Sequence, residues 1–112
     1  MSRSLYAGYM TASSGSSMGL FYLGDGILAG VDISGMKYDG TYELQLDGSY
    51  KGSLKYMIPS NTTVITGQSA TEDTQVVMPL ILPAEFWDGK VVRIETPLGL
   101  VNGRFEKIKD LP

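Results

Sequence analysis

Residues 36–58 read MKYDGTYELQLDGSYKGSLKYMI and carry the clearest structural signal in the chain. From Met36 onward, apolar residues and one glycine occupy the even positions, and polar residues occupy the odd positions. The alternation passes through the turn-forming residues 47–49, Asp-Gly-Ser, and resumes up to Ile58. A period of two residues is typical of a half-buried β-strand, and Asp-Gly is typical of a tight turn. The pattern therefore predicts a β-hairpin with one buried face.

The rest of the chain fits the same scheme in shorter segments. Gly24-Asp25-Gly26 is typical of a hairpin turn, and Pro79 lacks the amide for a ladder bond, which favours an edge strand or a bulge. Short links between sequential strands predict an antiparallel up-and-down meander, and closure into a barrel removes its free edges. We expect residues 1–112 to form one all-β domain, a single barrel of about eight strands. Besides the hairpin, strands are expected at residues 5–11, 18–23, 27–33, 64–66, 75–82, 90–96 and 100–108.

Composition excludes several kinds of chemistry. The 112 residues contain no histidine and no cysteine, so neither a Ser-His or Cys-His nucleophile pair nor the usual zinc site can form. We predict no catalytic, cofactor-binding or metal-binding residues, and no enzymatic activity. Nine Lys and Arg residues are scattered among twelve Asp and Glu residues, giving a net charge of −3, which argues against nucleic-acid binding. Without a signal-like or membrane-spanning apolar run, the expected location is the cytoplasm, with no membrane partner.

Tyrosines dominate the apolar positions of the predicted strands. A buried tyrosine fills much space and keeps a hydroxyl that needs a partner. One interpretation is a filled core whose hydroxyls meet at the barrel mouth. The alternative is a partly open cavity that holds a small hydrophobic ligand, because eight strands enclose either packed side chains or one ligand. The candidate lining residues are Tyr22, Tyr38, Tyr42, Tyr50, Leu54 and Tyr56.

Two further features concern single strands. Asp32 follows Val31 in an otherwise apolar strand, and we interpret it as a strand-end carboxylate that accepts hydrogen bonds from the next turn. Phe21 and Leu23 lie on the face opposite Tyr22, so we expect them to point outward if Tyr22 points inward. They would then form a patch for a second subunit or another protein, unless a loop or residues 86–87 cover them.

The order of residues resembles the GrlR-like family, which is named for a negative regulator of type III secretion genes in enteric bacteria. Gly30-Val31-Asp32 matches a Gly-Gly-Asp-like element of the family, and Tyr38, Gly40 and Tyr42 match its Tyr-x-Gly-x-Tyr motif. Leu5-Tyr6 near the start and a glycine before the last strand, Gly99 or Gly103, also fit.

The resemblance implies a lipocalin-like eight-stranded barrel that forms a homodimer and acts by binding. The regulator that names the family neutralises a transcriptional activator through an acidic loop, whereas the corresponding loop here, residues 47–49, holds one carboxylate. We therefore predict a non-catalytic regulatory protein that acts by protein–protein interaction, as a possible negative regulator of transcription or secretion genes. The alternative is a carrier or sensor of a small hydrophobic ligand inside the barrel.

Overall fold

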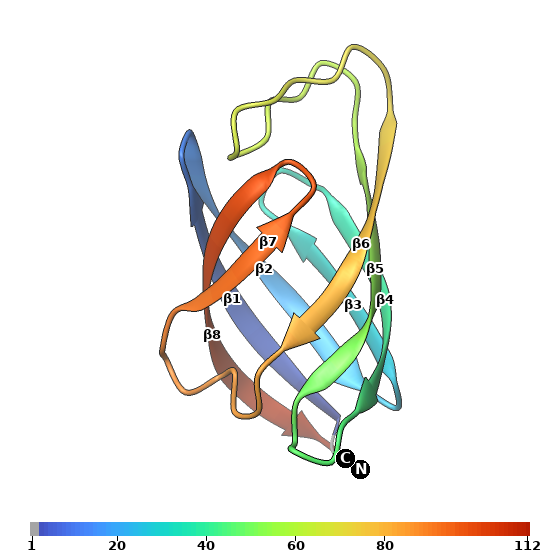
Figure 1. Ribbon diagram of the computed structural model, residues 1–112, viewed down its shortest axis with the longest axis vertical. Coiled ribbons are helices and arrows are strands. Elements are labelled where there is room, and N and C mark those ends of the chain that lie inside the picture. Colours follow the sequence, from blue (N-terminus) through green and yellow to red (C-terminus); the bar gives the residue numbers. More distant parts are fainter. Residues whose placement is uncertain (1–2) are drawn as a thin grey trace.

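The computed structural model describes residues 3–112 as eight antiparallel strands in one sheet (Figure 1). The strands follow the up-and-down order, so the predicted all-β, lipocalin-like barrel architecture is confirmed. Their bounds are β1 Arg3–Ala12, β2 Gly15–Gly24, β3 Ile27–Asp32, β4 Lys37–Leu44, β5 Tyr50–Ile58, β6 Thr74–Leu82, β7 Val92–Thr96 and β8 Gly99–Leu111.

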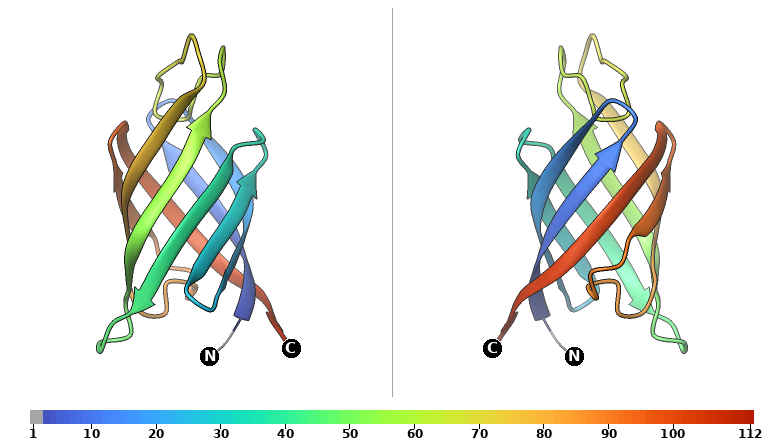
Figure 2. Two further views of the ribbon diagram at one scale, coloured as in Figure 1. Left: turned by 90° about the vertical axis from the view of Figure 1, so that its right-hand side faces the viewer. Right: turned by 90° about the vertical axis from the view of Figure 1, so that its left-hand side faces the viewer.

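The sheet curls into a barrel that is closed everywhere except along one line. The strand order is β6-β5-β4-β3-β2-β1-β8-β7, so β8 returns to pair with β1 over most of its length. Both strands that end the series, β6 and β7, are described completely, and no hydrogen-bonded ladder joins them. We call this line the β6–β7 seam. Figure 2 shows the tilted strands of the barrel wall from two further sides.

The tight turns form where the sequence predicts them. At the β2–β3 turn, Asp25 and Gly26 both have positive φ, 53° and 78°, as a two-residue turn that matches the twist of a hairpin requires. In the β4–β5 loop, the Asp47 carboxylate accepts a hydrogen bond from the backbone N–H of Ser49 at 2.9 Å. The predicted hairpin forms, with Tyr38 opposite Tyr56 and Gly40 opposite Leu54.

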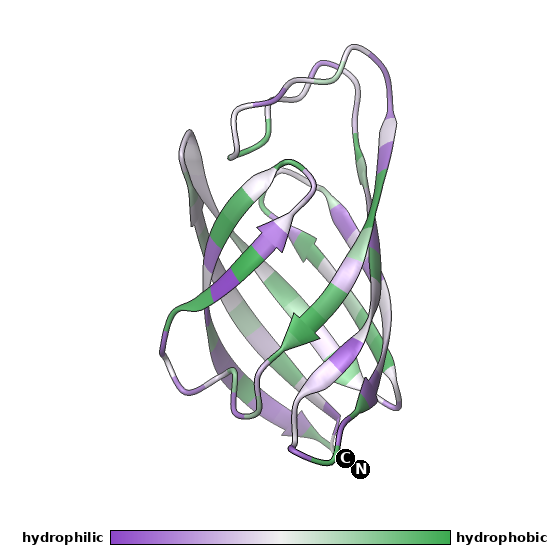
Figure 3. Cartoon of the chain, in the orientation of Figure 1, coloured by the Kyte–Doolittle hydropathy of each residue, from purple (hydrophilic) through white to green (hydrophobic). Residues whose placement is uncertain are grey.

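Most strands bury one side-chain face and expose the other. Figure 3 shows that hydrophilic and hydrophobic residues alternate along parts of the strands. On β6, Val76 and Met78 are buried while Val77, between them, is exposed. Leu44 and Leu46 depart from the predicted alternation, because β4 ends at Leu44 and the chain leaves the barrel there. Removal of the inward apolar side chains from water is the main favourable contribution to folding.

The orientation predicted for β2 is wrong. Phe21 and Leu23 are 6% and 4% exposed and lie in the core, so they form no outer interface patch. The reason is a floor of strand glycines: a Cβ atom at Gly8, Gly19 or Gly30 would lie within 3.1 Å of the Phe21 ring. These glycines leave the space that the ring occupies, and the alternation of β2 then carries Leu23 inward as well.

Residues 64–66, predicted as a strand, belong instead to the loop between β5 and β6. This loop, residues 59–73, folds over the upper end of the barrel in Figure 1. Val64 is buried there in a small cluster with Met36, Ile58 and Val76. The alternation from Val64 to Thr66 was too short to distinguish a strand from a loop that inserts one apolar side chain.

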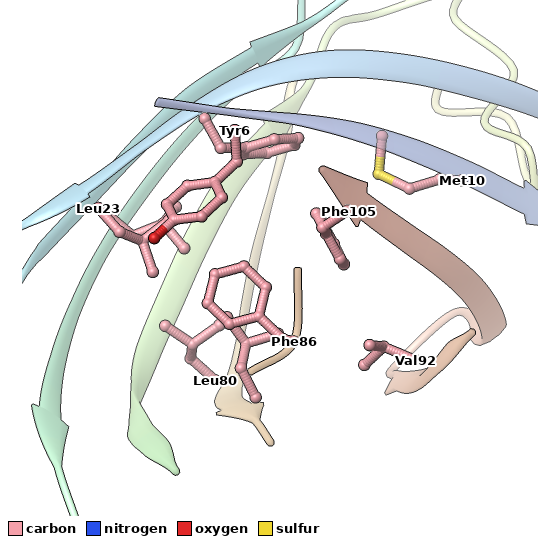
Figure 4. Packing of buried hydrophobic residues seen from close by; sticks show 10 residues of the cluster. Tyr6, Met10, Leu23, Leu80, Phe86, Val92 and Phe105 are labelled. Atoms are coloured by element: carbon pink, nitrogen blue, oxygen red, sulfur yellow. The ribbon is translucent and has the colours of Figure 1, made fainter. Parts of the chain in front are cut away.

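The opposite end is closed by the segment between β6 and β7, residues 83–91. Phe86 in this segment is 2% exposed and lies beside Tyr6 and Leu80 (Figure 4). Its ring centroid is 5.0 Å from that of Tyr6 and 5.6 Å from that of Phe105, distances typical of packed aromatic pairs. Both ends of the barrel are thus closed by loops that insert apolar side chains.

Candidate functional site

A cavity of about 440 Å³ lies inside the barrel between the two closed ends. Its wall combines inward-facing side chains of the strands with residues of the loop 59–73 and with Phe86. Most of these side chains are aliphatic or aromatic, as expected for a cavity that excludes water from an apolar ligand. They include Phe21, Leu28, Leu54, Met78, Val101 and Phe105.

The cavity reaches the barrel surface along the β6–β7 seam. In a closed barrel only every second residue of a strand faces the interior. Here the consecutive residues 79–82 of β6 and 93–96 of β7 all border the cavity. The cavity therefore extends between these two strands to the unpaired edges of the sheet.

The loop 59–73 is attached to the upper rim by a few hydrogen bonds. The backbone N–H of Ser14, in the β1–β2 turn, donates to the Ile65 carbonyl at 2.8 Å. The side-chain amide of Gln68 donates to the carbonyl of Leu98, in the β7–β8 turn, also at 2.8 Å. These bonds join the loop to both neighbouring turns and place Val64, Ile65 and Thr66 against the cavity.

Three of the predicted lining residues border the cavity, namely Tyr38, Leu54 and Tyr56. Tyr42 and Tyr50 face inward but lie at the lower end, where they pack against the core cluster around Phe86. Tyr22 was predicted to line the cavity, and this is wrong. It lies on the outer face of β2, because Phe21 and Leu23 on either side of it point inward.

A buried carboxylate holds the upper part of the wall. Asp32 is 6% exposed, and one of its oxygens accepts bonds from the backbone N–H groups of Ser34 and Met36, at 3.0 and 3.1 Å. The other oxygen accepts a hydrogen bond from the Tyr38 hydroxyl at 2.7 Å. The geometry matches the predicted strand-end carboxylate. It fixes the β3–β4 turn and orients Tyr38 at the cavity wall.

The tyrosines of the interior favour their neutral form. Burial, reinforced by the hydrogen bond to Asp32 and its charge, raises the pKa of Tyr38 well above its usual value of 10.0. Burial also raises the pKa of Tyr56, whose ring centroid lies 5.4 Å from that of Tyr38. Near neutral pH both residues therefore offer the cavity uncharged hydroxyl groups.

A second feature is a largely apolar outer surface on three neighbouring strands, which we call the outer β1–β3 face. Leu20 at its centre is 45% exposed and pairs with Ala7 on β1 and Val31 on β3. Apart from Arg3, Thr11 and Ser16 near the strand ends, the outward side chains of this region are apolar or tyrosine: Leu5, Ala7, Tyr9, Met18, Leu20, Tyr22, Ile27, Ala29, Val31 and Ile33. The adjacent strands present charges instead, for example Asp39 on β4 and Glu106 on β8.

Several site residues were missed from the sequence. The pattern did not show that Phe86 would enter the barrel or that Ile94 and Val101 would border a cavity. The continuous apolar run of residues 76–82 was a usable signal, because a strand apolar on both faces commonly has both faces covered or lies at an opening.

No family model, curated protein or solved structure matches the chain. The resemblance to the GrlR-like family therefore stays a prediction. Within residues 3–112 no helix is long and apolar enough to cross a membrane. The same residues hold no group of three or more potential metal-ligating side chains.

Proposed function

We propose that this protein is a non-catalytic carrier or sensor that binds one small hydrophobic ligand inside the barrel. The observation that carries the proposal is the cavity of about 440 Å³ between Phe86 at one end and the loop 59–73 at the other. Its volume lies in the range of small-molecule sites, which are largely apolar with a few polar groups. Phe21 and Leu23, which the sequence placed in an outer interface, lie in the core and border this cavity instead.

The cavity volume also limits the size of the ligand. Liquid water occupies roughly 30 Å³ per molecule, so the cavity corresponds to a ligand on the order of fifteen non-hydrogen atoms. A single alkyl chain or a two-ring compound has this size. In keeping with the sequence, we place this function in the cytoplasm.

The test is binding of the uncharged fluorophore N-phenyl-1-naphthylamine, which becomes bright in apolar surroundings. We expect saturable binding at one site per chain. Met78→Trp should fill part of the cavity and weaken binding at least tenfold, because Met78 borders it. Val77→Trp, on the exposed face of the same strand, is the matched control and should bind like the wild type.

Native mass spectrometry of the protein from its own host gives an independent readout. A small-molecule mass that disappears on denaturation is expected. If the wild-type protein binds no fluorophore and carries no such mass, the ligand-binding proposal fails. This result does not depend on whether Met78→Trp folds.

A second candidate function is protein binding through the outer β1–β3 face, with a second copy of the chain as the partner. An exposed apolar face of this kind commonly marks an interaction site. The chain exposes 6656 Å², whereas a folded monomer of 12.1 kDa exposes about 6,000 Å². Such contacts would suit the regulatory function and the homodimer that the family resemblance implies.

A further inference from the structure

The cavity is not equally apolar along its length. Its lower end is bordered mainly by hydrocarbon side chains, such as Leu23, Leu28 and Leu82, although Tyr6 also borders it beside Phe86. Its upper end, beneath the loop 59–73, carries four hydroxyl-bearing residues, Tyr38, Tyr56, Thr66 and Thr96, among apolar side chains such as Val64 and Leu98. A ligand that enters this gradient places its apolar part toward Phe86 and any polar group toward the loop.

The rim beyond this upper end also carries hydroxyl and amide groups. A second pocket of about 270 Å³ shares Thr66 and Leu98 with the main cavity. Its other walls include the side chains of Thr11, Ser13 and Asn102. The polar end of the cavity therefore borders a rim of mixed hydroxyl, amide and apolar side chains, and none of the described residues that line this rim is charged.

The cavity offers no buried counter-charge to an ionic ligand. Of the described residues that border it, only Arg93 and Glu95 are charged, and both are exposed residues of β7 at the seam, with opposite signs. Asp32 is buried nearby, but it does not border the cavity, and both of its oxygens already accept hydrogen bonds. Burying an unpaired carboxylate or ammonium group is costly, so a charged head group is disfavoured inside.

Tyr56 supplies the free polar group of the upper end. The hydroxyls of Tyr38 and Thr66 donate to Asp32 and Gln68, respectively. The Thr96 hydroxyl is also engaged, since it donates to the Gly99 carbonyl. The Tyr56 hydroxyl has no hydrogen-bond partner in the part of the chain that the structure describes. The side chain is partly buried, and this burial raises the pKa of Tyr56. A half-desolvated hydroxyl gains from a ligand oxygen that accepts its hydrogen bond.

We propose that the cavity selects an uncharged amphiphile, whose apolar part lies toward Phe86 and whose hydroxyl, ester or amide group binds the Tyr56 hydroxyl beneath the loop 59–73. This inference rests on the proposed ligand-binding function and adds the chemical class of the ligand.

The test compares three ligands that share a ten-carbon chain and differ in the head group: decan-1-ol, decanoate and decylammonium. Each displaces N-phenyl-1-naphthylamine from the wild-type protein at neutral pH. We expect decan-1-ol to bind at least tenfold more tightly than either ion. Tyr56→Phe should weaken decan-1-ol binding about threefold to tenfold, the effect of one lost hydrogen bond. The fluorophore itself, which needs no such bond, should bind with unchanged affinity.

Tyr9→Phe is the matched control, because Tyr9 lies on the outer face of β1 and does not border the cavity. If either ion binds as tightly as the alcohol while the fluorophore binds well, the head-group inference is wrong and the ligand-binding function stands. If Tyr56→Phe weakens the binding of decan-1-ol and of the fluorophore equally, the head-group inference is also wrong. If the fluorophore does not bind the wild-type protein at all, both proposals fail. The head-group ranking uses only wild-type protein, so it remains decisive if a variant does not fold.

Discussion

The Phe21 ring lies on a floor of glycines from three adjacent strands. Gly8, Gly19 and Gly30 belong to β1, β2 and β3, and their lack of side chains makes room for the ring. The Phe21 ring in turn packs against Tyr38 and Phe105, with centroids 5.5 and 6.1 Å away. Strand glycines usually weaken a sheet, but an aromatic ring that covers them restores the lost contact area.

A side chain at Gly30 should therefore disturb the core. An added Cβ atom would lie 2.4 Å from the Phe21 ring and 2.9 Å from the backbone oxygen of Leu20. We expect Gly30→Val to lower the free energy of unfolding by about 1–3 kcal/mol, as overpacking commonly does, measured by urea denaturation. Ala29→Val, one position along on the exposed face, is the control and should change stability little. Equal stability of the two variants would show that the glycine floor is not required.

The position of a single residue can be predicted from the sequence where neighbouring residues differ in polarity. Asp32 was correctly interpreted as a strand-end carboxylate, because one charged residue in an apolar strand requires local hydrogen bonds. The orientation of β2 could not be predicted in the same way. Residues 18 and 20–23 are all apolar or aromatic, so alternation gives no preference for either face, and the decisive contact with the glycines is made across strands.

Among the elements, the two loops that close the barrel differ most from what the sequence predicts. The hairpin of β4 and β5 was predictable because polar and apolar residues alternate along it. The loop 59–73 and the segment 83–91 have no such period, and what places Val64 and Phe86 inside is the space at the barrel ends. That space depends on the complete barrel and is not visible in a local pattern.

Phe86 makes the largest contribution of its segment to the core. We expect Phe86→Ala to lower the free energy of unfolding by about 3–5 kcal/mol, because it removes a ring that is 2% exposed and leaves a void at the lower end. The same change should enlarge the cavity and allow it to accept ligands with longer chains. Thermal or urea denaturation and displacement by a series of alkyl chains measure the two effects.

Val91→Ala serves as the control for Phe86→Ala, since Val91 lies in the same segment and is 68% exposed. It should alter neither stability nor chain-length preference. A Phe86→Ala variant as stable as this control would mean that the segment 83–91 does not close the barrel in solution.

For the whole molecule, the sequence predicted the barrel but left open whether its interior is filled. The balance depends on small differences between the volume that the strands enclose and the volume of the inward side chains. Six glycines inside strands reduce the volume of the inward side chains, and the rings of Phe21 and Phe105 fill only part of the space that results. These glycines are Gly8, Gly19, Gly30, Gly40, Gly52 and Gly103. The unfilled space is the cavity, and its size depends on the register of all eight strands, which no local sequence pattern gives.

The oligomeric state tests the outer β1–β3 face. If this face joins two copies, Leu20→Lys should convert a dimer into a monomer, because a charge would be buried without a partner at its centre. Sedimentation velocity measures the change directly. Ser53→Lys, on the exposed face of β5, is the control and should remain dimeric. A wild-type protein that sediments as a monomer at every concentration would exclude a second copy as the partner of this face.

The β6–β7 seam gives the barrel an adjustable circumference. In a fully hydrogen-bonded barrel, any increase in girth breaks backbone hydrogen bonds, so the enclosed width is fixed by strand number and stagger. Here β6 and β7 can move apart or together while all seven strand pairings stay intact. The wall should therefore adapt to ligands of different thickness, from a straight chain to a flat ring, whereas the two closed ends limit their length.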